Sequence, residues 1–317
     1  MYKTPKLKNN YIPADWNEGN TPVELSGVQI ENCGVYIRDI EDISSRLLDK
    51  YNAQEFKIKL FPGSDIAIFT LFSLLSSDYD KIYLFNEDYK QVAFFARILF
   101  KEVFFINGLD EAIENMPKDA VLYFSNPGNP SCKYYNSHEL SNKLPKDIVS
   151  VIDLAYVDYH ENFDYVDFDG HENIFFVKTC SKFYGLASIR IGMLFYNTSI
   201  SNLDDALEAV NSKWIGEAQY NALALVIDFD DDSLRIRLNE RFLDFERYLV
   251  NHVGADCNIY KAGNFFRLDF HYLNKKQEFL NFMDSNSISV RDLGHIKTLN
   301  KSVRINYRDE LYKALHI

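Results

Sequence analysis

A single lysine, with hydroxyl side chains just before it and an arginine shortly after it, is the feature of this chain best suited to chemistry. Lys182 lies in the segment from Thr179 to Gly192, which reads TCSKFYGLASIRIG. An unprotonated lysine can form a Schiff base with a carbonyl cofactor. Thr179, Ser181 and Arg190 are residue types that hold a phosphate, the arginine through two parallel hydrogen bonds. Taken alone, Ser181-Lys182 is more often a polar loop with a solvated lysine, so the rest of the chain has to decide.

Three other polar clusters follow strand-like segments, each at the point where the strand would end. They are Gly63-Ser64-Asp65, the NPGNP run at 126–130 and the DLAY run at 153–156. Each has a structural alternative, namely a helix cap, a double turn and a strand-end cap. Ligands of an open parallel sheet lie beyond the carboxyl ends of its strands, where helix N-termini also favour a phosphate. Four clusters at successive strand ends, the lysine loop included, therefore favour one shared ligand site.

Alternating strand-like and helix-like segments are expected to position these clusters. The pattern predicts strands at 56–60, 81–85, 103–106, 120–125, 148–153, 174–178 and 191–196, and helices at 40–51, 66–75 and 89–100. Such alternation is typical of a mostly parallel sheet covered by helices on both faces.

The pattern changes after about residue 200. Helices are predicted at 200–210 and from there to about 253, with a break near 228–232, followed by strands at 264–270, 287–291 and 302–306 and helices at 275–283 and 309–315. This suits a smaller α+β domain. We therefore predict a large domain at 36–200 and a small domain formed by 1–35 and 201–317.

Composition narrows the possible functions of the 317 residues. Hydrophobic residues make up 47%, which indicates a globular chain, and the net charge of −12 without a basic tract argues against nucleic acid as a partner. No signal peptide or membrane-spanning run is apparent. The four cysteines are scattered, and the seven histidines form no metal motif. A reducing cytoplasm and no metal site are expected.

The ordered motifs resemble those of the fold-type I, pyridoxal-phosphate-dependent aminotransferases of class I/II. Within that family they are most similar to the branch of histidinol-phosphate aminotransferase and threonine-phosphate decarboxylase. The resemblance extends from about Tyr36 to the C-terminus. It implies a three-layer α/β/α large domain with a mostly parallel sheet, a smaller α+β domain, a pyridoxal 5'-phosphate cofactor and a homodimer.

The resemblance also implies roles for individual residues. Lys182 matches the Schiff-base lysine, and Asp153 the aspartate that keeps the pyridine nitrogen protonated, so that the ring can accept electrons. Tyr156 and Asn129 match residues that hydrogen-bond the ring hydroxyl, and Tyr89 matches the aromatic residue that stacks on the ring. The implied phosphate ligands are Gly63, Ser64, Asp65, Thr179, Ser181 and Arg190.

Substrate-binding residues are implied nearer the C-terminus. Arg304, in SVRINYRDE, and Arg291, in SISVRDLG, match arginines that bind an acidic group of the substrate, and Asn264 matches an asparagine of the preceding strand. Tyr36 matches a tyrosine that reaches the partner's site across the dimer; the alternative is that it packs on its own chain. An N-terminal substrate loop matches only loosely, at 17–22.

Two departures from the family leave the substrate open. Leu154 stands where glutamate is usual, and Ser131-Cys132 replaces the usual Thr-Gly. The expected activity is transfer of an amino group between an amino acid or phosphorylated amine and a keto acid, with Lys182 as general acid and base. One alternative is decarboxylation of a phosphorylated amino acid, which the second arginine of RINYR, Arg308, suggests. Another is a non-catalytic binding protein, against which the joint presence of the cofactor residues speaks.

Overall fold

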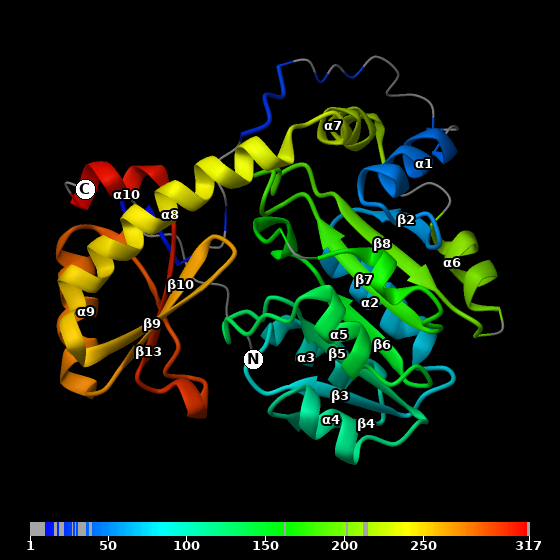
Figure 1. Cartoon of the computed structure of the whole chain (residues 1–317), viewed down its shortest axis with the longest axis horizontal. Coiled ribbons are helices and arrows are strands. Elements are labelled where there is room, and N and C mark those ends of the chain that lie inside the picture. Colours follow the sequence, from blue (N-terminus) through cyan, green and yellow to red (C-terminus); the bar gives the residue numbers. More distant parts are fainter. Residues whose placement is uncertain are drawn as a thin grey trace.

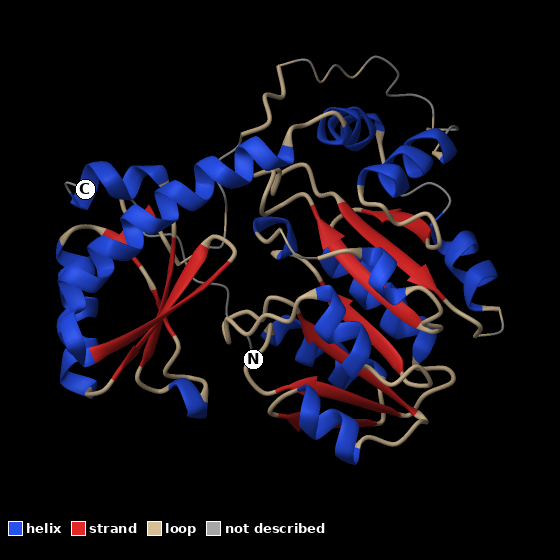
Figure 2. Ribbon diagram, viewed as in Figure 1, coloured by secondary structure: helices blue, strands red, loops and turns tan. Residues whose placement is uncertain are grey.

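The two larger β-sheets of the protein lie side by side in the computed structural model (Figures 1 and 2). The structure describes residues 10–15, 18, 22–26, 28, 30, 36–37, 40–161, 163–200, 202–211 and 215–315. The predicted N-terminal substrate loop at 17–22 lies mostly outside these residues. No helix within the described ranges is long and apolar enough to cross a membrane. The cytoplasmic location stays a prediction.

The larger sheet has seven strands, and all but one of them are parallel. In sheet order they are β2 (Lys57–Phe61), β8 (Gly192–Asn197), β7 (Ile174–Thr179), β6 (Val149–Asp153), β5 (Ala120–Ser125), β3 (Lys81–Phe85) and β4 (Glu102–Ile106). Only β8 is antiparallel to its neighbours. The sequences of β5 and β7, AVLYFS and IFFVKT, are buried at every position, as expected for central strands covered on both faces.

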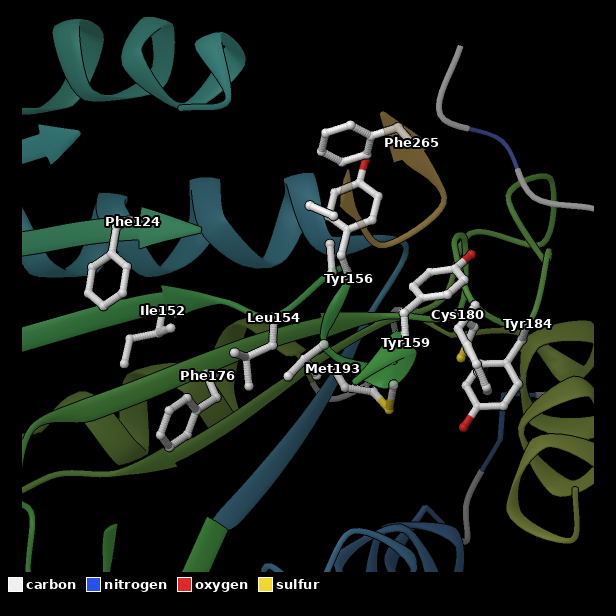
Figure 3. Packing of buried hydrophobic residues seen from close by; sticks show 14 of the residues in the cluster. Phe124, Ile152, Leu154, Tyr156, Tyr159, Phe176, Cys180, Tyr184, Met193 and Phe265 are labelled. Carbon is white, nitrogen blue, oxygen red and sulfur yellow. The ribbon is translucent and has the colours of Figure 1, made fainter. Parts of the chain in front are cut away.

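Helices cover both faces of this sheet, and the side chains of each strand alternate between them. On one face pack α2 (Ser64–Leu75), α3 (Lys90–Leu99) and α6 (Leu203–Asn211), in contact with Val121, Val151 and Val177. On the other face lie α1 (Glu41–Lys50), α4 (Leu109–Asn115), α5 (Ser137–Lys143) and the 3₁₀ turns η1 (Val157–Tyr159) and η2 (Tyr165–Phe168). Figure 3 shows Phe124 and Phe176 within the core of that second face.

The smaller sheet is antiparallel, in the order β12 (Arg291–Asp292), β13 (Ser302–Asn306), β10 (Phe265–Phe270) and β9 (Cys257–Ala262). The helices α8 (Asp231–Val253), α9 (Leu273–Ser285) and α10 (Asp309–Leu315), with the turns η3 (Gly254–Asp256) and η4 (Lys297–Leu299), accompany it. A short strand near the N-terminus, β1 (Ile12–Pro13), pairs with β11 (Ile288–Ser289). The long helix α8 contacts both η1 and β9, so it connects the two sheets (Figure 1).

The predicted α/β class is confirmed, including the mostly parallel sheet and the second, smaller α+β unit. The predicted break in the long helical stretch separates α7 (Glu217–Ile227) from α8. Strand β9 was not predicted, because it is half exposed and carries lysine and asparagine. Helices α6 and α7 pack on β2 and α1, beside the larger sheet. The proposed domain division at residue 200 stays a prediction.

Candidate functional site

The carboxyl ends of the parallel strands meet above the α2–α3 face of the larger sheet. The last residues of β5, β6 and β7 are Ser125, Asp153 and Thr179. Each lies an even number of positions after a residue of the same strand whose side chain packs on the α2–α3 face. Strand alternation therefore directs the three side chains to one side of the sheet. A cavity of about 440 Å³ opens there. Its lining includes Ser64, Asp65, Tyr89, Asn129, Tyr156, Lys182, Arg190 and Arg304.

One end of the cavity is suited to a phosphate group. The Thr179 hydroxyl lies 2.9 Å from the Ser181 hydroxyl and accepts the Ser181 amide at 3.1 Å. The Arg190 guanidinium donates to the Ala187 carbonyl at 3.1 Å and lies 3.5 Å from the Ser181 hydroxyl. Helix α2 begins at Ser64, so its first amides add partial positive charge to this end.

Two glycines allow the backbone and the arginine to approach one another at this end. Gly63 has φ of +96°, and a Cβ added to it would lie 2.3 Å from the terminal nitrogen of Arg190. A Cβ added to Gly192 would lie 2.4 Å from the carbonyl carbon of Gly63. Any larger side chain at either position would displace Arg190 or the start of α2. Gly63 therefore shapes the cradle without lining the cavity itself.

Lys182 follows β7 and presents its amine to the cavity. Removal from bulk water, followed by the nearby positive charge of Arg304, lowers the pKa of Lys182 to about 8, although the negative charges of Asp65, Glu18 and Asp153 act in the opposite direction. The Lys182 Nζ lies 5.8 Å from the centre of the Tyr156 ring. Because the pKa is close to neutrality, a substantial fraction of the amine is uncharged and nucleophilic near pH 8.

Asp153 lies at the floor of the same cavity and is only 6% exposed. Its carboxylate accepts the Ala155 amide at 3.0 Å and the Tyr123 hydroxyl at 3.0 Å. Burial, followed by the negative charge of Asp88, raises the pKa of Asp153 to about 7. A cation placed against this carboxylate would lower that pKa again, so the site is suited to a protonated heterocyclic nitrogen.

A chain of hydrogen bonds links the wall of the cavity to the smaller sheet. Arg304 donates to the Asn129 side-chain oxygen and to the Asp15 carbonyl, both at 2.8 Å. The Asn129 amide in turn donates to the Tyr156 hydroxyl at 3.4 Å. Tyr156 packs edge-on against Phe265 of β10, with ring centres 5.3 Å apart (Figure 3). Arg304 therefore reaches the cavity from the second sheet and is held by uncharged acceptors there.

Tyr89 closes the cavity on the side of α3. It is the residue before the first turn of that helix, and its hydroxyl hydrogen-bonds Asp65. Burial raises the pKa of Asp65, while Arg190 and Lys182 lower it. An aromatic side chain over the floor formed by Asp153 leaves a slot suited to a flat ring.

Four of the residues predicted from the sequence do not line this cavity, namely Gly63, described above, and Arg291, Asn264 and Tyr36. Arg291 lines a larger, adjoining cavity of about 1290 Å³, which shares Asp15 and Tyr89 with the first. Asn264 is buried, and its amide donates to the Glu18 carbonyl at 3.3 Å. Tyr36 is 68% exposed on the surface of its own chain. Their assignments stay predictions.

The structure adds site residues that the sequence pattern did not reveal. Asp15, from the N-terminal segment, lines the cavity, as does Ser125. Glu18, which lies within the loosely matched loop at 17–22, lines it as well. Glu18 forms an ion pair with Arg308 at 3.3 Å, which gives this second arginine a local partner. Asp88 is buried next to Tyr89. Asp88 alone had a local signal, as an acid directly before a helix, and that signal is also the ordinary pattern of a helix cap.

The fold and the cavity define an α/β protein with a lysine of lowered pKa, a buried carboxylate and a cradle suited to a phosphate at one sheet edge. A family model, aminotransferase class I and II, matches residues 35–315, and the chain belongs to this family. The resemblance seen in the sequence is thereby confirmed. The members of this family use pyridoxal phosphate.

Individual relatives are more distant. The chain is 30% identical over 182 residues to histidinol-phosphate aminotransferase of Pelagibacter ubique, an alignment that covers 51% of each chain. The chain spans about half the length of the curated relatives it matches. In fold it is similar to histidinol-phosphate aminotransferase of Sinorhizobium meliloti in complex with pyridoxal-5'-phosphate (18% identity, TM-score 0.76, 96% and 88% of the two chains). It is also similar to L-threonine-O-3-phosphate decarboxylase of Porphyromonas gingivalis (17% identity, TM-score 0.74, 96% and 97%).

Proposed function

We propose that this protein is a pyridoxal-phosphate-dependent aminotransferase that moves an amino group between an amino acid or phosphorylated amine and a keto acid. The observation that carries the proposal is the arrangement in one cavity of a lysine of lowered pKa, a buried carboxylate and a phosphate cradle. Neither Gly63 nor Gly192 could carry a side chain without displacing Arg190 or the start of α2. The absence of side chains at these two glycines lets the α2 amides and the Arg190 guanidinium converge on a phosphate.

Each group of residues has a separate task in this proposal. Pyridoxal phosphate, when bound, supplies an electron-withdrawing ring that stabilises negative charge at the substrate Cα. The hydroxyls of Thr179 and Ser181, with Arg190, would hold its phosphate. Asp153 would hold the proton of its ring nitrogen, and Tyr156 would hydrogen-bond its ring hydroxyl.

Lys182 would move the proton that the reaction requires. Its amine faces the cavity from the strand end next to Asp153. With a pKa of about 8, it can accept a proton at the substrate Cα and return it without a large energetic penalty. Arg304 would orient an acidic group of the substrate, since it lines the cavity and its guanidinium donates to neutral oxygens of Asn129 and Asp15 at the cavity wall.

The function is tested with purified protein, added pyridoxal phosphate and a panel of amino acids and phosphorylated amines. A spectral change of the bound cofactor that a keto acid reverses, with the aminated product identified by mass spectrometry, is the expected result. Release of carbon dioxide without a keto-acid requirement would instead establish the decarboxylase alternative. No spectral change with any donor, despite bound cofactor, would contradict catalysis altogether.

We expect Arg304→Lys to impair substrate binding more than cofactor binding. Lysine keeps the charge but loses the planar pair of donors, which removes a charged hydrogen bond of about 1.5–3 kcal/mol. The Michaelis constant of the substrate should rise roughly 10- to 100-fold, while the dissociation constant of pyridoxal phosphate changes little. The matched variant is Arg291→Lys, because Arg291 is the same type of residue and lies directly opposite Arg304 in the β12–β13 pair. If Arg304→Lys instead loses the cofactor and keeps its affinity for the substrate, Arg304 binds the cofactor rather than the substrate.

We also propose that two chains form a dimer in which Tyr36 completes the partner's site. Tyr36 is exposed, and two apolar side chains of α2, Ile66 and Phe69, are 40% and 37% exposed beside the phosphate end of the cavity. Such surfaces are typical of protein interfaces.

Mixing two inactive variants tests this dimer. Tyr36→Ala mixed with Lys182→Ala should recover activity, because one site of each mixed dimer then contains both native residues. Lys182→Ala mixed with Asp153→Ala is the control and should recover none, since both residues belong to the same chain's site. A monomeric protein, or no recovery after proven subunit exchange, would refute the shared site.

A further inference from the structure

A second buried carboxylate lies behind the cavity, in a place that the proposed function does not use. Asp88 follows β3, immediately before Tyr89, and is 7% exposed. Its carboxylate accepts the Ser125 amide at 2.6 Å, the Ser125 hydroxyl at 2.5 Å and the Tyr89 amide at 2.6 Å. The backbone of Asn129 adds a further hydrogen bond. Asp88 therefore fixes three residues whose side chains line the cavity.

The same carboxylate is coupled to Asp153 through the sheet. Ser125, which Asp88 holds, is the direct partner of Asp153 in the β5–β6 pairing. Tyr123, two residues earlier on β5, donates its hydroxyl to Asp153. The negative charges of both Asp153 and Asp88 raise the pKa of Tyr123, and Ser125 hydrogen-bonds it. Asp88 and Asp153 thus belong to one hydrogen-bonded network.

The charges around this network do not neutralise it. Among the residues that the structure describes, neither Asp88 nor Asp153 forms an ion pair with lysine or arginine. The titratable groups that face them are Tyr123 from β5, Asp65 from α2 and Lys182 from the loop after β7. Two carboxylates buried without a cation are costly when both are charged, so a bound proton or cation is favoured between them.

We propose that Asp88 is a positioning residue that places a second carboxylate behind Asp153, so that the pair shares a proton near neutral pH in the apoprotein and would hold a protonated cofactor ring in the loaded protein. The role toward the cofactor ring rests on the proposed function. The shared proton concerns the apoprotein alone and needs no cofactor.

The apoprotein should therefore lose stability as the pH rises. Burial raises the pKa of Asp88 to about 6 and, together with the charge of Asp88, that of Asp153 to about 7, above the usual value of 3.8. Between the usual value and these raised values, the folded state therefore binds more protons than the unfolded state. The stabilisation is fully present below about pH 4 and is lost as the pH rises through 6 to 7.

The first experiment measures the free energy of unfolding of the apoprotein by urea between pH 5 and 8. In Asp88→Asn, the number of protons taken up on folding in this range should fall by about one relative to the wild type. Asp88→Glu, which keeps the charge, should retain most of the slope. The matched control is Asp230→Asn, because Asp230 likewise accepts a backbone amide at the start of a helix but lies exposed before α8.

The second experiment follows the ring nitrogen of ¹⁵N-labelled pyridoxal phosphate by NMR in the loaded protein. The ring nitrogen should lose its proton at a lower pH in Asp88→Asn than in the wild type, Asp88→Glu or Asp230→Asn, because a nearby negative charge is gone. If Asp88 only holds the backbone through its hydrogen bonds and has no electrostatic role, this titration should be unchanged.

The outcomes separate the two proposals. If Asp88→Asn shows the wild-type pH slope in the apoprotein and the wild-type ring-nitrogen titration, Asp88 only holds the backbone in place and the inference is wrong. If pyridoxal phosphate does not bind, the proposed function fails, while the urea series still decides the role of Asp88. If Asp88→Asn does not fold, ¹³C-carboxyl titration of the wild-type apoprotein replaces it: a carboxyl pair that titrates above pH 5 supports the inference, and titration of both groups near pH 4 overturns it.

Discussion

Lys182→Ala is expected to abolish turnover, with a loss of at least about 10⁴-fold, because both covalent attachment of the cofactor and proton transfer at Cα depend on this amine. Borohydride reduction of the wild-type protein loaded with pyridoxal phosphate should fix the label on Lys182, as peptide mass spectrometry can show. Lys101→Ala, an exposed lysine paired with Asp80 far from the cavity, is the control and should behave as the wild type. A label on another lysine would contradict the central assignment.

The same lysine gives a pH dependence with a definite sign. Only the uncharged amine attacks a carbonyl, and the pKa of Lys182 is about 8. The rate at which the apoprotein captures pyridoxal phosphate should therefore rise with pH up to about 8 and then level off. Because Arg304 contributes to the lowered pKa, Arg304→Met should move this rise to higher pH. A capture rate that is flat across this range would show that the amine is not the reacting group.

Asp153→Asn is expected to have the second largest effect. Asparagine keeps the shape and the contact with the Ala155 amide but removes the charge that would hold the ring nitrogen proton. Turnover should fall roughly 10²- to 10³-fold, comparable to the loss of one electrostatic stabiliser of the reacting state. The borohydride label on Lys182 should remain, since the lysine and the phosphate cradle are unchanged. Near-normal turnover with bound cofactor would remove Asp153 from the mechanism.

Glu161→Asn is a suitable control for Asp153→Asn. It also removes a carboxylate, in the loop after η1, but it is exposed and does not line the cavity around Lys182. Activity and cofactor binding in this variant should remain within about twofold of the wild type, as is usual for surface substitutions. A large loss in the control would mean that activity is sensitive to any charge change in this region.

Much of the site could be predicted from the sequence because its main residues lie within short, local patterns. Thr179, Ser181, Lys182 and Arg190 fall within one stretch of the chain, directly after a buried strand. Parallel strands place all their carboxyl ends at one edge, so the clusters after β2, β5, β6 and β7 could be expected to meet. That expectation agrees with the cavity, which contacts residues from each cluster.

The tertiary structure decided what depends on contacts between distant segments. Arg291 and Arg304 have similar local sequences and are direct partners across β12 and β13, yet they line different cavities. The pairing of β1 with β11 carries the N-terminal segment, with Asp15, to the wall of the site. No local pattern specifies either arrangement, because each depends on how the smaller sheet packs against the larger one.

The coupling of Asp88 to Asp153 illustrates the same division between sequence and structure. In the sequence, Asp88 is one acid before a helix, 65 residues from Asp153, and nothing in its spacing points to the other carboxylate. In the fold, β3 and β6 both flank β5, and Ser125 and Tyr123 of β5 connect the two side chains through hydrogen bonds. The residue types that can perform the chemistry are thus determined by the sequence. The burial and the neighbouring charges that set their pKa values arise only when the sheet is assembled.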